Sequence, residues 1–124
     1  MIIETVRLSQ EAKEQLIKLK RHTGITQWNI LCRWALCLSL AEGKLPQDKD
    51  IALDSSVEMT WKTFGGRHQE LYSLAVRERC KKDGIELSNE SLQKYFKLHL
   101  HRGISYLASS NMVRSIEDLV AMTT

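Results

Sequence analysis

The chain of 124 residues has little proline, cysteine or aromatic content: one Pro, three Cys, and 6% Phe, Trp and Tyr. Three cysteines are too few for a disulfide framework and fit a protein of a reducing compartment. No apolar run reaches the length of about 18 residues that a membrane span needs. The first residues, Met1 to Glu4, do not read as a secretory signal. We therefore expect a cytoplasmic protein.

Patterns that carry catalysis or bind metal are also missing. Cys32 and Cys37 are five residues apart, about 140° around a helix, so they cannot share a metal ion. His99 and His101 point to opposite sides of a helix, and neither has a Cys or carboxylate at ligand spacing. We expect His99 to be hydrogen-bonded in the core and His101 to be solvated. The sequence thus predicts no enzyme, no catalytic residue, no metal site and no cofactor.

The first 44 residues predict a strand, a basic amphipathic helix and an apolar helix. Residues 3–8 are β-prone, and Ser9 can cap a helix that Gly24 ends. We expect Thr26 to cap the next helix, which should stop at Gly43. This layout is that of a ribbon-helix-helix unit, in which two chains intertwine their second helices. The expected core positions of the first helix are Ala12, Leu16 and Leu19.

The second helix carries the most apolar stretch of the chain. Within residues 30–41 only Arg33 and Ser39 are polar, so apolar residues fall on nearly every face and must be surrounded. A chain this small has few elements of its own with which to enclose a helix. We therefore expect a homo-oligomer. The candidate interface residues are Ile30, Leu31, Trp34 and Leu38.

The remainder predicts a mainly α fold in one compact domain, residues 1–124, because no linker or repeat divides it. A connection over residues 45–66 contains a possible strand at residues 57–61, and Gly65-Gly66 form a tight turn. The last part, residues 67–124, is predicted to be helical. Its expected helices cover residues 67–83, run from Ser88 to a break or end at Gly103, and cover residues 104–108 and 116–121.

The net charge of +3 is unevenly distributed along the chain. Residues 1–44 carry +3, residues 45–60 carry −3, and residues 61–124 carry +3. A charged helix face is often merely solvated, but four copies would total +12 and group the N-terminal cations. The cations that we expect to contact DNA phosphates are Lys13, Lys18, Lys20, Arg21, Arg33 and Lys44.

Several segments, in order along most of the chain, carry a family resemblance. They lie at residues 6–9, 16–26, 28–35, 61–66, 70–72 and 99–107. Together they resemble the DNA sulfur-modification protein DndE family. The resemblance implies a DNA-binding accessory subunit of the bacterial machinery that replaces a non-bridging phosphate oxygen of DNA with sulfur.

The same resemblance implies the partners. It predicts a homotetramer that binds the backbone of duplex DNA, with preference for nicked duplex. The sulfur chemistry would belong to a cysteine desulfurase, an ATP-using sulfurtransferase-like subunit and an ATPase. A sulfur-carrying Cys in this chain remains an alternative to the inert role that buried cysteines usually have.

Two other functions stay open. A ribbon-helix-helix repressor or antitoxin would read bases with alternating strand residues, here Thr5 and Arg7. A scaffold that joins partner subunits without touching DNA is the third possibility. Equal affinity for unrelated duplexes would exclude the repressor, and steeply salt-dependent duplex binding would exclude the scaffold.

Overall fold

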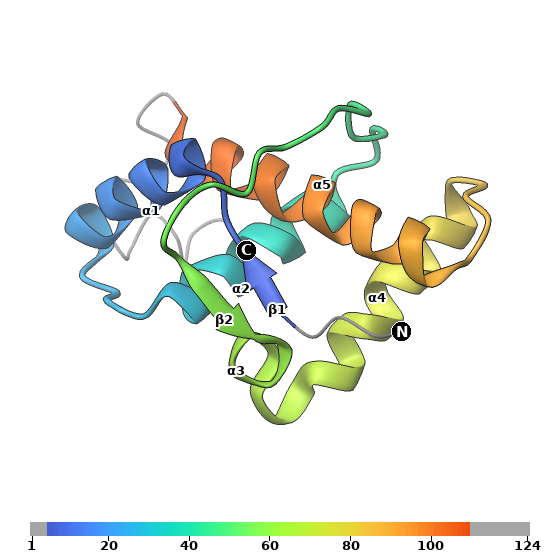
Figure 1. Cartoon of the computed structure of the whole chain (residues 1–124), viewed down its shortest axis with the longest axis horizontal. Helices are drawn as coiled ribbons and strands as arrows, with labels where there is room; N and C mark the ends of the chain where they lie inside the picture. The colour runs from blue at the N-terminus through green and yellow to red at the C-terminus, as the bar shows by residue number, and fades with distance from the viewer. Residues whose placement is uncertain (1–4, 110–124) are drawn as a thin grey trace.

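The computed structural model describes residues 5–109, and they form a mainly helical fold, as predicted (Figure 1). Helix α5 runs along the molecule, with α1 at one end of the long axis and α4 at the other. The elements in order are β1 (Thr5–Arg7), α1 (Gln10–Thr23), α2 (Trp28–Ala41), β2 (Glu58–Thr60), α3 (Trp61–Gly65), a 3₁₀ turn η1 (Gly66–His68), α4 (Gln69–Lys82) and α5 (Asn89–Ala108).

The two short strands pair with each other in antiparallel register, with Val6 opposite Met59 and Arg7 opposite Glu58. Val6 and Met59 face the core, while the outer pair forms an ion pair of 2.5 Å. Both strands were predicted from their composition. In a ribbon-helix-helix unit the partner strand comes from a second chain, whereas β1 here pairs with a strand of its own chain.

The ends of α1 follow the local signals in the sequence. The Ser9 hydroxyl accepts a hydrogen bond of 3.0 Å from the Ala12 amide, and Gly24 adopts φ +76° and donates its amide to the Lys20 carbonyl. The start of α2 differs from the prediction: its N-cap is Gln27, with no side-chain cap, so the expected cap at Thr26 is wrong. Helix α2 also ends two residues before Gly43, at Ala41.

Helix α5 is continuous through Gly103, where the sequence predicted a break or an end. It begins at the predicted cap, Ser88, in a capping box with Ser91. A Cβ on Gly103 would lie 1.8 Å from the carbonyl oxygen of Ala35 on α2. The glycine therefore allows α2 and α5 to cross closely, and it does not interrupt the helix.

The packing of α2 contradicts the argument that the chain has too few elements to enclose this helix. Four of its side chains have no exposed area in the single chain, because α5 and neighbouring helices cover them: Leu31, Cys32, Ala35 and Leu36. The premise that this chain cannot enclose its own apolar helix is therefore wrong. Leu31 in particular belongs to the core of its own chain and cannot contact a second copy.

A short helix that the sequence did not predict, α3, completes the core. Thr60 caps it, and its rings stack on one another and on α5: the centroids of Trp61 and Phe64 are 5.1 Å apart, and each ring lies 5.3 Å from Phe96. Within residues 5–109 no helix is long and apolar enough to cross a membrane. The predicted helices at residues 104–108 and 116–121 are, respectively, the end of α5 and a segment outside the described residues.

Candidate nucleic-acid interface

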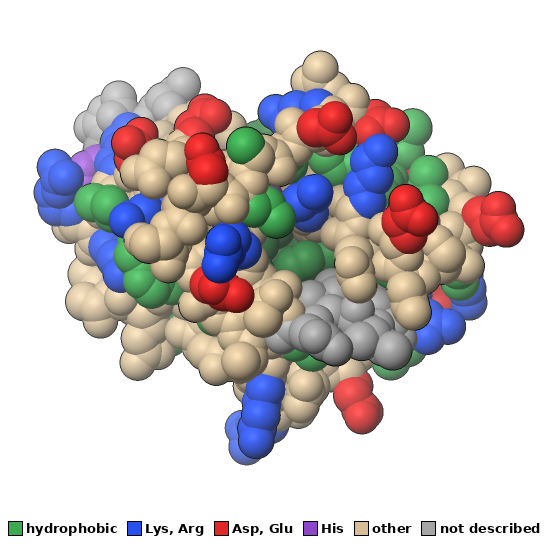
Figure 2. Space-filling view, viewed as in Figure 1, with side chains coloured by type: hydrophobic (Ala, Val, Ile, Leu, Met, Phe, Trp, Pro, Cys, Tyr) green, Lys and Arg blue, Asp and Glu red, His purple; other side chains and the backbone are tan. Residues whose placement is uncertain are grey.

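The C-terminal half of α1 forms a basic end of the molecule. Its last turn contains Lys20, Arg21 and His22, and Lys18 lies just before them. In Figure 2, Lys and Arg side chains and a His gather at the left edge, over this end of α1. Elsewhere on the same face, acidic and basic side chains are interspersed. The helix dipole favours cations at a helix C-terminus, so these charges are compatible with the helix even without a ligand.

Two of the predicted cations on α1 are fixed by neighbours on the same flank. The Lys20 ammonium sits 3.3 Å from the centre of the Trp28 ring, and burial lowers the pKa of Lys20. The Lys13 ammonium donates a hydrogen bond of 2.8 Å to the Ser56 hydroxyl. These contacts hold both lysines along one side of α1 without removing their charge.

The other two predicted cations on α1, Lys18 and Arg21, are more exposed. Lys18 points to the opposite flank, where its ammonium lies 3.4 Å from the Ala108 carbonyl at the end of α5. Arg21 is exposed. Within residues 5–109, no ion pair with a carboxylate involves Lys13, Lys18, Lys20 or Arg21. Lys18 and Arg21 are therefore the cations best placed to meet an outside phosphate.

Arg33 lies elsewhere and has a structural role. Its guanidinium donates from Nε to the Phe64 carbonyl and from Nη2 to the Thr63 carbonyl, the latter at 3.2 Å. Gly66, at φ +56°, leaves room for it: a Cβ there would lie 3.0 Å from Nη2. The structure therefore does not bring Arg33 together with the basic end of α1.

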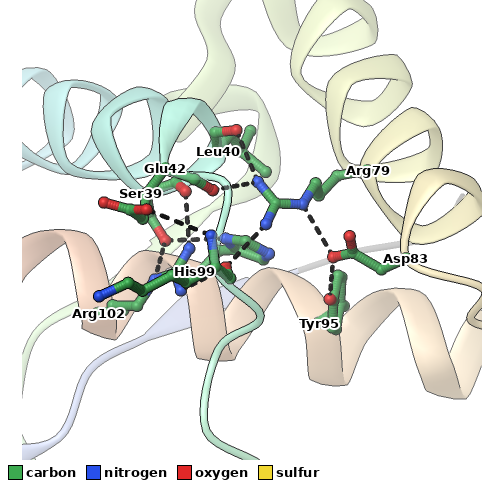
Figure 3. Close-up of polar contacts among 9 residues, drawn as sticks. Ser39, Leu40, Glu42, Arg79, Asp83, Tyr95, His99 and Arg102 are labelled. Carbon is green, nitrogen blue, oxygen red and sulfur yellow. Dashed lines mark hydrogen bonds and ion pairs between the residues drawn. The ribbon is translucent and has the colours of Figure 1, made fainter.

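Lys44 follows α2, and its backbone carbonyl accepts hydrogen bonds from Arg79 and Arg102, two arginines that Figure 3 shows at the end of this helix. Two arginines, Arg79 and Arg102, here called the arginine clamp, enclose the C-terminal end of α2. Arg79 donates to the carbonyls of Leu40, Glu42 and Lys44 at 2.6–2.8 Å, and Arg102 to those of Ser39 and Lys44 at 2.8 Å. The Ser39 carbonyl also accepts from the Glu42 amide, whereas carbonyls at a helix end generally need partners from outside the helix.

The clamp also orders Ser39 and His99. Ser39 Oγ accepts from Arg102 Nε at 2.8 Å and lies 2.8 Å from His99 Nδ1. His99 Nδ1 is thus within hydrogen-bond distance of the hydroxyl, whereas Nε2 is buried and has no hydrogen-bond partner in the described residues. Burial, and then the charges of Arg102 and Arg79, lower the pKa of His99 to about 4. His99 is therefore neutral at pH 7, in the core, as predicted.

Asp83 balances the charge of the clamp. It accepts from Arg79 Nε at 2.8 Å and from the Tyr95 hydroxyl, and although burial opposes its ionisation these bonds hold the pKa of Asp83 below its usual value. Sequence reasoning missed Arg79, Asp83 and Arg102, because their partners are mostly backbone carbonyls far along the chain. The one local signal was the i, i+4 spacing of Arg79 and Asp83.

His101 and the cysteines offer little reactivity. His101 is partly buried rather than solvated as expected: its Nε2 accepts from the Ser9 amide at 3.1 Å. Burial raises the pKa of the Cys32 thiol to about 12, and Cys80 is also buried, while Cys37 is exposed. Among residues 5–109, no group of three or more His, Cys, Asp or Glu is placed to hold a metal ion.

The outer side of α2 and the adjoining α4 present an apolar surface. Of the predicted interface residues, Ile30, Trp34 and Leu38 are only partly buried, and their spacing places them on one face of α2. On α4, which contacts α2, Leu71 and Leu74 are 62% and 55% exposed.

Comparisons with known proteins agree on one family. The sequence profile of a family described as DNA sulphur modification protein DndE matches residues 5–115. The fold is similar to the crystal structure of DndE from Escherichia coli B7A, described as involved in DNA phosphorothioation modification: the TM-score is 0.72 with 26% identity, over 86% of this chain and 98% of that one. A crystal structure of a DndE mutant involved in DNA phosphorothioation has a TM-score of 0.68 and 22% identity, over 88% and 100% of the two chains. No curated protein sequence matches the chain.

Proposed function

Because the chain belongs to the DndE family of DNA sulphur modification proteins, we propose that it is the DNA-binding accessory subunit of a phosphorothioation system. It binds duplex DNA through backbone phosphates, and nicked duplex in preference. The observation that carries the proposal is the basic end of α1, where Lys18 and Arg21 are exposed with no carboxylate partner in the described residues.

The chemistry of this surface suits phosphate more than base edges. Three of the four Lys and Arg residues on α1 are lysines, compact charges that approach a phosphate from many directions. Lys13 and Lys20 lie on one flank of α1 and Lys18 on the other, so the helix offers charge to the backbone on both sides. Phosphate contacts give affinity and register without sequence preference. Lys44 extends the basic surface beyond α1, whereas Arg33 is left out because its donors hold backbone carbonyls.

The repressor alternative loses support from the strands. A base-reading ribbon would need free side chains on β1, but Arg7 is held by Glu58 at 2.5 Å and one edge of β1 is paired with β2. The scaffold alternative is addressed by experiment, since only DNA binding itself separates a scaffold from a DNA-binding subunit.

Self-association multiplies the charge that faces DNA. We propose a homotetramer that packs through the partly exposed face of α2, with Ile30, Trp34 and Leu38, and through Leu71 and Leu74 of α4. An exposed apolar surface of this kind typically marks a protein interface. The other partners are the sulfurtransferase-like subunit, the ATPase and the cysteine desulfurase of the same system, which carry out the sulfur chemistry. We assign no catalytic residue to this chain.

The proposal is tested by measuring binding to three duplexes of equal length: two unrelated intact sequences and one with a single nick. We expect equal affinity for the two intact duplexes, tighter binding to the nicked one, and a steep fall of affinity with salt. Light scattering of the same samples gives the mass of the assembly, expected to be four chains. Absence of duplex binding at low salt would favour the scaffold, and binding to one intact sequence alone would favour the repressor.

A further inference from the structure

A groove lies between α1, α5 and the connection that follows α2. Its volume is about 360 Å³, and residues 44–51 of the connection form one of its walls. Ser9, Ala12 and Gln15 line it from α1, and Leu98 and Ser105 from α5. This volume falls within the range of about 300–1,000 Å³ that is typical of small-ligand sites. The groove adjoins the arginine clamp, because Arg102 and Lys44 belong to both.

The groove is predominantly basic. Lys44 and Lys49 line it from the connection and Arg102 from α5, while Glu11 on α1 is the one acidic residue among residues 5–109 that lines it. The nearby Asp48 does not add negative charge to the groove, because it forms a 2.8 Å ion pair with Lys94. The polar lining therefore favours an anion on the side away from Glu11.

Lys49 lines the groove together with His101, on which its charge acts. Burial lowers the pKa of His101, a lining residue, and the charges of Lys97 and Lys49 lower it further. Lys44 and Lys49 are exposed, and neither ammonium has a hydrogen bond or ion pair in the described part of the chain. Arg102 uses three of its five donors on Ser39 and Lys44, so its guanidinium is fixed in place with two donors left.

An aromatic ring lies beside these cations. Tyr106 is partly exposed in the groove, and the Arg102 guanidinium carbon is 5.6 Å from the centre of its ring. An aromatic side chain next to a basic cluster is the arrangement that holds a single nucleotide, because the base stacks on the ring while cations hold the phosphate.

The groove also continues toward the basic end of α1. Gln15 lines it, and Lys18 lies one helical turn further along α1. On α5, Ser105 lines it, and Ala108, one turn further, accepts the Lys18 hydrogen bond. A strand bound at the basic end of α1 would thus reach the groove with its end.

We propose that this groove binds one nucleotide, with Lys44, Lys49 and Arg102 on its phosphate and Tyr106 against its base. The nucleotide is either the phosphorylated end of a DNA strand or a free mononucleotide, which share this chemistry. The strand-end form rests on the function proposed above.

The first experiment uses thymidine 5′-monophosphate as the probe and nuclear magnetic resonance titration of the full chain as the readout. We expect shifts of groove resonances that thymidine, which lacks the phosphate, does not produce. Lys49→Gln and Tyr106→Leu should each weaken binding about fivefold, as expected when one charge-assisted or stacking interaction is removed. Lys82→Gln, the same charge change on the exposed end of α4, should leave it unchanged. Absence of shifts in the groove, or equal binding by Lys49→Gln and the wild type, would overturn the proposal.

The second experiment separates the two sources. Nicked duplexes are compared that differ only in a 5′-phosphate or a 5′-hydroxyl at the nick. If the chain binds the 5′-phosphate duplex more tightly and Lys49→Gln abolishes this difference, the ligand of the groove is a strand end. If thymidine monophosphate binds but the two duplexes bind equally, the ligand is a free nucleotide. Binding of intact duplex serves as the independent reference. If intact duplex binds and the mononucleotide does not, the nucleotide site is wrong but the proposed function stands. If intact duplex does not bind at all, the proposed function is wrong.

Discussion

The basic end of α1 and the arginine clamp at the end of α2 use cations at the same kind of place, the C-terminus of a helix, with opposite results. At α1, Gly24 completes the helix end, so Lys18 and Arg21 are left exposed. At α2 no glycine cap forms, and Arg79 and Arg102 donate to backbone carbonyls at the helix end and just beyond it. How the backbone of a helix end is satisfied decides whether its cations stabilise the fold or are available to a ligand.

Removing Arg79 should lower the stability of the fold more than any other change proposed here. In Arg79→Met, the carbonyls of Leu40 and Glu42 lose the donor that Arg79 supplies, that of Lys44 keeps only Arg102, and Asp83 stays buried without its ion pair. We expect the free energy of unfolding to fall by about 3–5 kcal/mol, as for other broken buried pairs. Urea unfolding measures it, with Lys82→Met on the same helix as the matched control. A decrease no larger than that of the control would mean that the clamp does not hold the end of α2.

Acid should weaken the clamp in a defined pH window. The pKa of His99 is about 4 in the folded chain against 6.5 as its ordinary value, so the unfolded state takes up a proton that the folded state refuses. Stability is complete above pH 6.5 and falls as the pH drops toward 4, by up to about 3 kcal/mol. The lowered pKa of His101 acts in the same direction.

Urea midpoints at pH 7.5 and 4.5 measure this decrease, and His99→Gln is the informative variant. It removes the titrating group, so the difference between the two midpoints should shrink. An unchanged difference would show that His99 is not the group responsible.

The local signals at α1 were readable from the sequence, and those at α2 were not. Ser9, Gly24 and the spacing of Leu16 and Leu19 act within a few residues, and all were predicted. The clamp joins Arg79 to carbonyls 35–39 residues away, and no local pattern encodes such a partner.

The same limit explains the errors elsewhere in the fold. Gly103 looked like a helix end because its reason, close approach to Ala35, depends on a helix far away in the sequence. Leu31 looked like an interface residue because composition alone cannot distinguish a helix covered by its own chain from one covered by a copy. The groove beside α1 could not be predicted for a similar reason, since Lys49 and Tyr106 are brought together only by the fold.

Replacing Arg33 should lower stability less than replacing Arg79. The sequence predicted Arg33 as a DNA contact, but its guanidinium donates to backbone carbonyls, so it tests which of the two roles a cation has. Arg33→Gln removes the donors to Thr63 and Phe64, so the free energy of unfolding should fall by about 1 kcal/mol. Duplex affinity should stay the same. A large drop in duplex affinity with unchanged stability would show that Arg33 contacts DNA.

The most direct test of the proposed DNA surface is the salt dependence of duplex binding by Lys18→Gln/Arg21→Gln. The double variant should fold with unchanged stability and bind unrelated duplexes more weakly by a common factor. The slope of log K against log salt should fall in magnitude by about 0.9 for each phosphate that is no longer neutralised. A matched pair on α4, Lys81→Gln/Lys82→Gln, carries the same charge change and should keep the wild-type slope. Equal slopes for the two double variants would contradict the claim that the basic end of α1 binds the DNA backbone.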